Sequence, residues 1–164
     1  MLKLYLFRHA KSSWDNPGIS DFDRPLSKRG LGDAPRIGKI YGKLYKMPDL
    51  VITSSARRAL ETAELISDRI GYSIDRIVQD GRIYAASVYD LVKVIRKLDN
   101  DNKTVLLFGH NPGVTSLANY LTGVHIDNMP TCSFVSINFR FDKWKKVTEE
   151  AGEFVLFDYP KNHK

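Results

Sequence analysis

Short apolar runs alternate with longer amphipathic segments along the first two-thirds of the chain, and strand-like segments dominate the last third. The short runs have the length of buried strands, whereas apolar side chains that recur at three- and four-residue spacing indicate helices. The expected strands are residues 4–7, 50–53, 73–78, 104–108, 133–141 and 153–157. The expected helices are approximately residues 30–45, 54–70, 88–98 and 113–121.

This order of elements predicts an α/β fold. Alternation of strands and helices is typical of a parallel sheet with helices on its faces, and consecutive strands favour antiparallel pairing. We therefore expect a three-layer sandwich with a mostly parallel central sheet, helices on both faces and an antiparallel addition at one edge. No repeat, low-complexity tract or linker interrupts the pattern, so residues 1–164 are expected to form one domain.

Serines precede two of the expected helices and can cap their free amides. Ser27 stands before the first helix, and the Ser54–Ser55 pair stands before the second. Pro35 is expected near the first turn of its helix, where a missing amide is tolerated. Residues 11–27 are polar and contain Pro and Gly, which indicates a loop. Long ordered loops in compact domains are often functional.

Basic side chains follow three of the expected strands. Arg8 and His9 end the first strand, Arg57 and Arg58 follow the second, and His110 follows the strand at 104–108. If these strands are parallel neighbours, their carboxyl ends share the edge of the sheet where open α/β folds bind ligands. Guanidinium groups bind phosphoryl oxygens through paired hydrogen bonds, and a neutral imidazole can attack phosphorus. The pattern therefore predicts a phosphoryl-transfer site.

Composition and charge narrow the class of partner. The chain carries 25 Lys and Arg against 19 Asp and Glu, and its net charge of +6 favours anionic partners. No zinc-finger or RNA-recognition pattern occurs, so nucleic acid is not an expected ligand. No apolar run reaches the roughly 20 residues that span a bilayer, so no membrane association is expected. With a single cysteine, Cys132, and no leader pattern, we expect a cytoplasmic protein without disulfides.

The stretches at the strand ends together resemble the motifs of one enzyme family. Residues 8–15 (Arg-His-Ala-Lys-Ser-Ser-Trp-Asp) are similar to an extended Arg-His-Gly signature, and residues 54–63 to a Ser-Pro-x-x-Arg-Ala-x-x-Thr-Ala helix start. Gly109–His110 resembles a second histidine motif. These are the motifs of the histidine phosphatase superfamily, which has the phosphoglycerate-mutase-like fold. The small size of the chain, with residues 23–26 and 109–113, resembles its SixA-type phosphohistidine phosphatase branch.

The resemblance implies a set of site residues. His9 would be phosphorylated during turnover, and water would then release phosphate. The residues implied to form the phosphate pocket with it are Arg8, Arg58 and His110. The further residues expected to bind substrate are Ser12, Asn111 and Asp80. No cofactor or metal ion is implied, and the four histidines lack the spacing of zinc ligands.

The expected substrate is phosphohistidine on a protein, with a small phosphomonoester as the alternative. A phosphomutase of the same superfamily is disfavoured because the chain is short for the loops that retain a phosphorylated intermediate. A non-catalytic module that binds phosphorylated partners is disfavoured because the core site residues are intact. The protein is expected to act as a monomer.

Several positions depart from the family pattern or leave a choice open. Ala10 replaces glycine next to the implied nucleophile, Ser55 replaces proline, and Asp15 stands where many relatives carry asparagine. Arg57 is an alternative to Arg58 as the pocket cation, although the alignment on an Arg-Ala pair favours Arg58.

The general acid is the least determined part of the site. Oxygen esters leave as poor alkoxides and need a proton donor. Asp80 is the best-placed carboxylate for this role, and capping of a turn is the alternative. A phosphoramidate needs less help, because a protonated imidazole leaves readily, so a site without a firm acid favours phosphohistidine.

Two other phosphatase chemistries are rejected from the sequence. The aspartates of residues 21–23 mimic the pair used by haloacid-dehalogenase-type phosphatases, but they do not follow an apolar strand. Cys132 lacks the downstream arginine of cysteine phosphatases and is expected in the core or at an edge. Trp14 is expected either to line the site or to pack its loop onto the domain.

Overall fold

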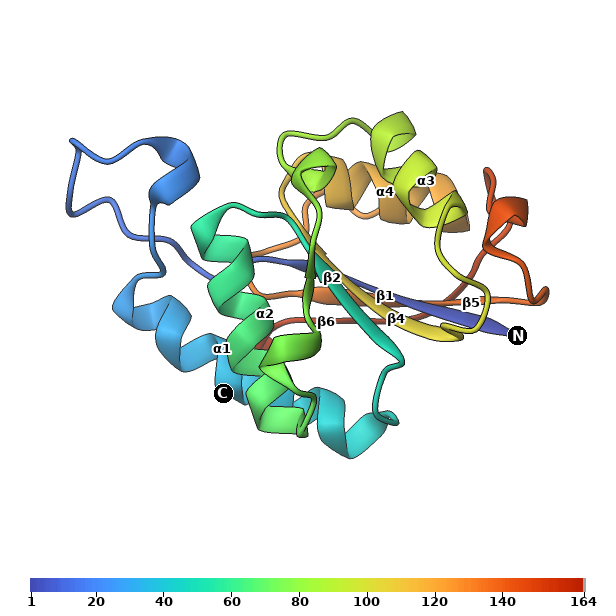
Figure 1. Ribbon diagram of the computed structural model, residues 1–164, viewed down its shortest axis with the longest axis horizontal. Coiled ribbons are helices and arrows are strands. Elements are labelled where there is room, and N and C mark those ends of the chain that lie inside the picture. The colour runs from blue at the N-terminus through green and yellow to red at the C-terminus, as the bar shows by residue number, and fades with distance from the viewer. Residues whose placement is uncertain (164) are drawn as a thin grey trace.

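A six-stranded sheet forms the middle of the computed structural model, which describes residues 1–163 (Figure 1). The strands follow the order β3-β2-β4-β1-β5-β6 across the sheet. Their bounds are Leu2–Arg8 (β1), Leu50–Thr53 (β2), Val78–Gln79 (β3), Thr104–Gly109 (β4), Phe134–Phe139 (β5) and Glu153–Asp158 (β6). The helices are Lys28–Leu44 (α1), Arg57–Ile70 (α2), Val88–Arg96 (α3) and Gly113–Thr122 (α4).

The strands that carry the expected site are parallel neighbours. β4 lies between β1 and β2 and is parallel to both, and β3 extends this part of the sheet beyond β2. β5 pairs antiparallel with β1, and β6 pairs antiparallel with β5. The mostly parallel sheet with an antiparallel addition at one edge is therefore confirmed.

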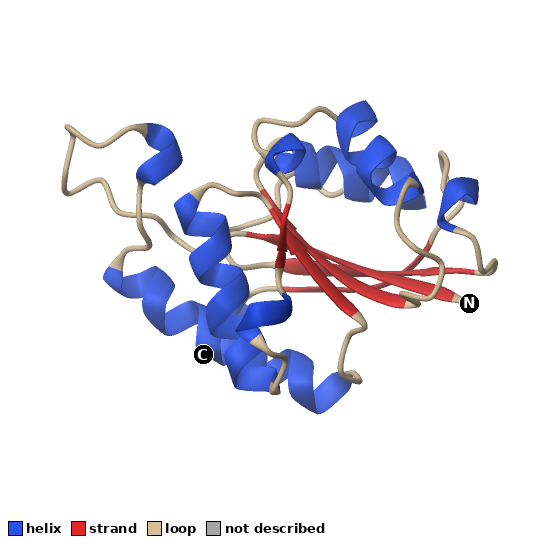
Figure 2. Cartoon of the chain, in the orientation of Figure 1, coloured by secondary structure: helices blue, strands red, loops and turns tan. Residues whose placement is uncertain are grey.

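Different helix pairs cover the two faces of the sheet, as Figure 2 shows. In β1, Leu4 and Leu6 join the buried cluster that includes α3 and α4, whereas Tyr5 and Phe7 join the cluster that includes α1 and α2. The pleat points successive side chains to opposite faces, so an almost wholly apolar strand fills both clusters. This confirms the predicted three-layer α/β sandwich. No helix within residues 1–163 is both long and apolar enough to cross a membrane.

The strand predicted for residues 73–78 is wrong. Residues 74–76 form a 3₁₀ turn, and only Val78–Gln79 pairs as β3. Ile74 and Val78 are each 44% exposed. The apolar content of this segment misleads because the segment lies at the edge of the sheet, where little packs against it.

The predicted helix starts are partly correct. Ser27 caps α1, and its hydroxyl accepts a hydrogen bond from Gly30 N at 3.2 Å. The predicted cap by the Ser54–Ser55 pair is wrong, because the N-cap residue of α2 is Ala56, whose side chain makes no capping hydrogen bond. Pro35 lies in the interior of α1 rather than in its first turn, because the helix begins earlier than predicted.

Residues 11–27 form the expected loop between β1 and α1, and this loop extends away from the sheet in Figure 1. A β-bridge between Ser12 and Leu26 closes its base. The chain leaving β1 passes so close to α1 that a Cβ on Gly30 would lie 2.2 Å from the carbonyl oxygen of Lys11. The absence of a side chain at Gly30 therefore allows the loop to start where it does.

Candidate active site

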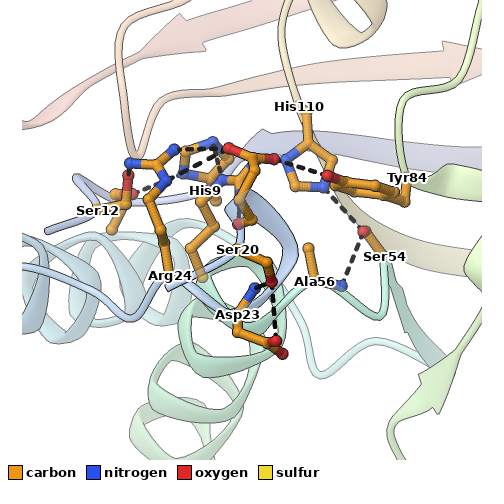
Figure 3. Close-up of polar contacts among 12 residues, drawn as sticks. His9, Ser12, Ser20, Asp23, Arg24, Ser54, Ala56, Tyr84 and His110 are labelled. Atoms are coloured by element: carbon orange, nitrogen blue, oxygen red, sulfur yellow. Dashed lines mark hydrogen bonds and ion pairs between the residues drawn. The ribbon is translucent and has the colours of Figure 1, made fainter. Parts of the chain in front are cut away.

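The carboxyl ends of β1, β2 and β4 meet at one edge of the sheet and bring three parts of the chain together (Figure 3). Arg8 is in register with Gly109, and Thr53 with Phe108, so the residues that follow each strand emerge side by side. They border a cavity of about 240 Å³, called the catalytic cavity below. It is lined by Arg8, His9, Lys11, Ser12, Trp14, Arg24, Arg58, His110, Asn111 and Thr131.

His9 follows β1 and is only 7% exposed. Its Nδ1 lies 2.7 Å from the carbonyl oxygen of Ala10, which can only accept, so Nδ1 carries the ring hydrogen. Nε2 therefore keeps its lone pair, toward which Arg58 Nε–H points at 3.4 Å. Burial above all, with smaller contributions from His110, Arg58 and Arg8, lowers the pKa of His9 to about 3. The ring is thus neutral near pH 7, and its unprotonated Nε2 is the nitrogen that can act as a nucleophile once Arg58 turns to a bound anion.

Backbone contacts hold the chain around His9. Cys132 N donates to the carbonyl oxygens of Arg8 (3.1 Å) and His9 (3.0 Å), and Ala10 N donates to Thr62 Oγ1 (3.0 Å). The side chain of Ala10 is fully buried in the cluster beneath α1 and α2, so the methyl group that replaces the family's hydrogen packs into the core. Burial raises the pKa of the Cys132 thiol, which places this residue in the core as a packing residue.

Arg58, rather than Arg57, is the arginine of α2 that enters the site. Arg58 is 6% exposed and reaches His9, whereas the side chain of Arg57 is 53% exposed and pairs with Glu61 at 3.6 Å. Consecutive residues project about 100° apart around an α-helix. Only one of the two can therefore face the sheet edge, and it is the one favoured by the Arg-Ala alignment.

His110 follows β4 and is half-buried, with its ring centroid 5.1 Å from that of His9. Its Nε2 lies 2.8 Å from Ser54 Oγ, as Figure 3 shows. Ser54 Oγ already accepts from Ala56 N, so its own hydrogen is free to be donated to Nε2. The ring hydrogen then sits on Nδ1, which is buried and has no partner among the described residues. Burial, followed by Arg58, lowers the pKa of His110 to about 4.

Arg8 borders the cavity and is held from the far side by residues near the start of β5. Its Nη1 donates to the carbonyl oxygen of Met129 at 2.8 Å, and burial lowers its pKa. Asn111 donates to the same carbonyl at 3.0 Å and to Asn128 Oδ1 at 2.8 Å, while its own Oδ1 accepts from Thr115. Asn111 thus lines the cavity, as expected of a substrate-binding residue, but its amide is occupied in holding the segment that positions Arg8.

Asp80 lies outside the set of described residues that line the catalytic cavity. Its carboxylate accepts from the backbone N, the Nε and the Nη2 of Arg82, at 3.0, 2.9 and 2.6 Å. The hydrogen bond from the Arg82 side chain is the main reason that its pKa is lowered. The structure therefore places Asp80 in the capping position that the sequence left open as an alternative.

Asp21 is the residue beside the site that sequence reasoning missed. Its Oδ2 accepts from Arg58 Nη2 (3.1 Å) and Tyr84 Oη (2.7 Å), and its Oδ1 accepts from Arg24 (3.2 and 3.3 Å). Its backbone carbonyl accepts from Arg58 Nη1 at 2.7 Å. The hydrogen bond from Tyr84 above all, with the two arginines, lowers the pKa of Asp21 to about 2. The carboxylate is therefore ionised near pH 7.

Arg24 connects this aspartate to the expected residue Ser12. Its Nη1 donates to Ser12 Oγ at 2.7 Å, and its guanidinium lies 3.6 Å from the ring centroid of Trp14. Arg24 is only 8% exposed although it belongs to the loop. The Asp-Arg-Pro-Leu motif and the polar character of the loop were the available signals. Neither indicates which loop side chain reaches α2, because that contact joins residues 37 positions apart.

The arrangement suits a tetrahedral oxyanion placed against Nε2 of His9. Arg8, Arg24 and Arg58 surround the catalytic cavity, and their forks can hold phosphoryl oxygens through charge-assisted hydrogen bonds. α2 and α4 both begin beside the cavity, and their N-terminal dipoles favour an anion there. These features support attack by His9 on a bound phosphoryl group.

Comparisons with known proteins identify the family and the fold of this chain. The sequence profile of the histidine phosphatase superfamily (branch 1) matches residues 4–84. A chloroplastic protein of Arabidopsis thaliana is 30% identical over 158 residues, which cover 92% of this chain and 72% of that protein. One solved structure is that of a protein named as the phosphohistidine phosphatase SixA of Agrobacterium tumefaciens, whose sequence is 25% identical to this chain. The match covers 97% of this chain and 98% of that chain, and the two structures superpose with a TM-score of 0.82. A protein histidine phosphatase SixA complexed with tungstate shares the fold, with 21% identity, coverage of 99% and 100%, and a TM-score of 0.83.

Proposed function

This chain belongs to the histidine phosphatase superfamily, and we propose that it hydrolyses phosphohistidine on a protein substrate through a phosphoryl intermediate on His9. The family and its SixA-type neighbours support a phosphatase. The neutral His9 ring, with its hydrogen held on Nδ1 by Ala10, supplies the nucleophile.

The reaction has two displacements at phosphorus. In the first, the lone pair of His9 Nε2 forms a bond to phosphorus while the bond to the substrate's imidazole nitrogen breaks, and that nitrogen leaves with the electron pair. The leaving ring is neutral when its other nitrogen carries a proton. In the second, water attacks phosphorus, the bond to His9 breaks, and the proton lost by water remains with the released phosphate. The Ala10 carbonyl oxygen accepts from Nδ1–H throughout and stabilises the positive charge of the phosphorylated ring.

The observation that carries the choice of substrate is the lack of an acid. Within the part of the chain that the structure describes, no carboxyl group lines the catalytic cavity. Asp21 lies beside it but is ionised, because its pKa is lowered to about 2. An alkyl ester needs a proton donor for its leaving oxygen, whereas the imidazole of phosphohistidine does not. This difference supports a phosphoramidate substrate over a phosphomonoester.

The mouth of the site supports a macromolecular substrate. The side chain of Asp21 is 52% exposed, and Trp14 is 69% exposed. Small-molecule sites usually enclose most of their ligand. A site bordered by exposed loop side chains can instead receive a histidine that projects from a protein surface.

The test measures phosphate release from a phosphohistidine protein, from phosphoserine and from an aryl phosphate, with a chelator present. We expect the phosphohistidine protein to be hydrolysed fastest and all hydrolysis to be lost in His9→Ala. Fast hydrolysis of the esters with an inert phosphohistidine protein would instead establish a small-molecule phosphomonoesterase. Isomerisation of a phosphoglycerate would establish a mutase, and binding without turnover a non-catalytic module.

A further inference from the structure

A second cavity adjoins the catalytic cavity and is larger, about 590 Å³ against about 240 Å³. Arg8, Lys11 and Thr131 line both, so the two cavities are neighbours that share one wall. The second cavity extends from there along α1 to the chain that follows β6. Tyr159 and Lys161 line it at that end. We call it the basic groove. Its charged residues are Arg8, Lys11, Arg29, Asp33, Arg36 and Lys161.

Positive charge is concentrated in the basic groove. Among the residues that the structure describes, five cationic side chains and one carboxylate line it, which gives a net charge of +4, against +6 for the whole chain. The carboxylate, Asp33, is shared between Arg29 at 3.7 Å and Arg36 at 3.6 Å. The side chains of these arginines remain 60% and 46% exposed. One carboxylate that bridges two guanidiniums leaves the groove with unneutralised cations open to solvent.

Arg8 links the groove to the chemistry. Its Nε is buried and has no partner among the described residues, while its Nη1 is held by Met129. A buried donor without a partner is rare in folded proteins. The Arg8 side chain lines both cavities, so its guanidinium is available to anions bound at their junction. The guanidinium of Arg8 therefore borders both the basic groove and the catalytic cavity.

We propose that the basic groove binds carboxylate side chains that flank the phosphohistidine on the protein substrate. This inference rests on the proposed function. Apart from Arg8, the cations are long, exposed side chains around the groove, which fits the surface of a protein better than an enclosed small molecule. Complementary charge at such an edge increases the rate of encounter and fixes the orientation of the partner. The phosphohistidine enters the catalytic cavity while its acidic neighbours lie along α1.

The test compares two synthetic peptides with a central phosphohistidine, one flanked by glutamates and one by glutamines, and adds free phosphoramidate as a substrate without flanks. Exposed ion pairs are weak individually, so we expect wild-type kcat/KM to favour the glutamate peptide by about three- to ten-fold at low salt. The preference should shrink as salt increases. The double variant that combines Arg36→Gln with Lys161→Gln should lose most of this preference for the glutamate peptide. Its hydrolysis of free phosphoramidate should stay unchanged.

The matched control is Lys39→Gln with Lys43→Gln, which removes two exposed charges from the same helix outside the groove. This variant should keep the full preference. Equal hydrolysis of the two peptides by the wild type, or an undiminished preference in the groove variant, would overturn the groove inference alone. Failure to hydrolyse either peptide or phosphoramidate, with an aryl phosphate still hydrolysed, would overturn the proposed function and the groove inference together.

Discussion

The inner part of the site and the loop that borders it are built in different ways. His9, Arg58 and His110 stand at strand ends or at a helix start, and the two residues that approach each other most closely, His9 and Arg58, are 7% and 6% exposed. Asp21 belongs to the loop of residues 11–27, and its side chain is 52% exposed. The inner residues are placed by sheet register and backbone hydrogen bonds, whereas the carboxylate of Asp21 in the loop is held by the side chains of Arg24, Arg58 and Tyr84.

This difference predicts that substitutions in the two parts of the site have different effects. In the proposed mechanism, the inner residues supply the nucleophile and the charges that stabilise a transferring phosphoryl group, so changes there should affect turnover most. Asp21 holds Arg24 and Arg58 with a negative charge that a phosphoryl group must displace or share. Changes in the loop should therefore act mainly on the affinity for oxyanions.

The largest expected effect is on the nucleophile. His9→Ala should lower kcat/KM for a phosphohistidine protein by about 10⁴-fold or more, because the covalent route is lost. Initial rates of phosphate release at substrate concentrations well below KM measure this. His125→Ala is the matched control, since this histidine is 87% exposed and pairs with Asp127. A His9→Ala enzyme within ten-fold of wild type would remove His9 from the mechanism.

Arg58→Lys should lower kcat/KM by about 10²- to 10³-fold, because lysine keeps the charge but loses the fork that holds two phosphoryl oxygens. Arg57→Lys, one position away and exposed, should change it by less than about two-fold. Steady-state kinetics on both variants decides between the two arginines. Comparable losses in both would contradict the assignment of Arg58 to the pocket.

The buried histidine should also make the protein sensitive to acid. The folded-state pKa of His9, about 3, lies below its ordinary value of 6.5, so the unfolded chain binds more protons between these values. Stability therefore rises with pH across this window, and acidification from pH 7 to pH 5 should cost about 2 kcal/mol on this account. Urea unfolding at both pH values should show a smaller loss in His9→Gln. An equal loss in wild type and variant would show that His9 is not held neutral.

The smallest effect is expected in the loop. Asp21→Asn should strengthen inhibition by orthovanadate by about three- to ten-fold, because Arg24 and Arg58 lose a competing carboxylate. The inhibition constant measures it. Asp23→Asn is the control, since Asp23 lies in the same turn but contacts Ser20. Weaker inhibition of Asp21→Asn would show that the aspartate organises the arginines more than it competes with oxyanions.

Much of the fold was predictable because the relevant signals are local. The apolar runs of β1, β2 and β4 mark buried strands by themselves, and Ser27 marks the start of α1. The prediction failed at residues 73–78, where apolar content was not matched by burial. Burial at the edge of a sheet depends on what packs against it, and a local pattern does not contain that information.

By itself, the sequence determined which polar side chains stand near the strand ends. His9 and His110 each follow an apolar run after one intervening residue, and Arg58 lies in the first turn of the helix that follows another such run. Parallel pairing then brings such ends to one edge. Only the tertiary structure decided that Ser54 contacts His110 instead of capping α2, that Asp80 pairs with Arg82, and that Asp21 reaches Arg58. It also decided that α1 and the chain after β6 form the basic groove. These contacts join segments distant in sequence, so they depend on how the layers pack and how the loop folds back.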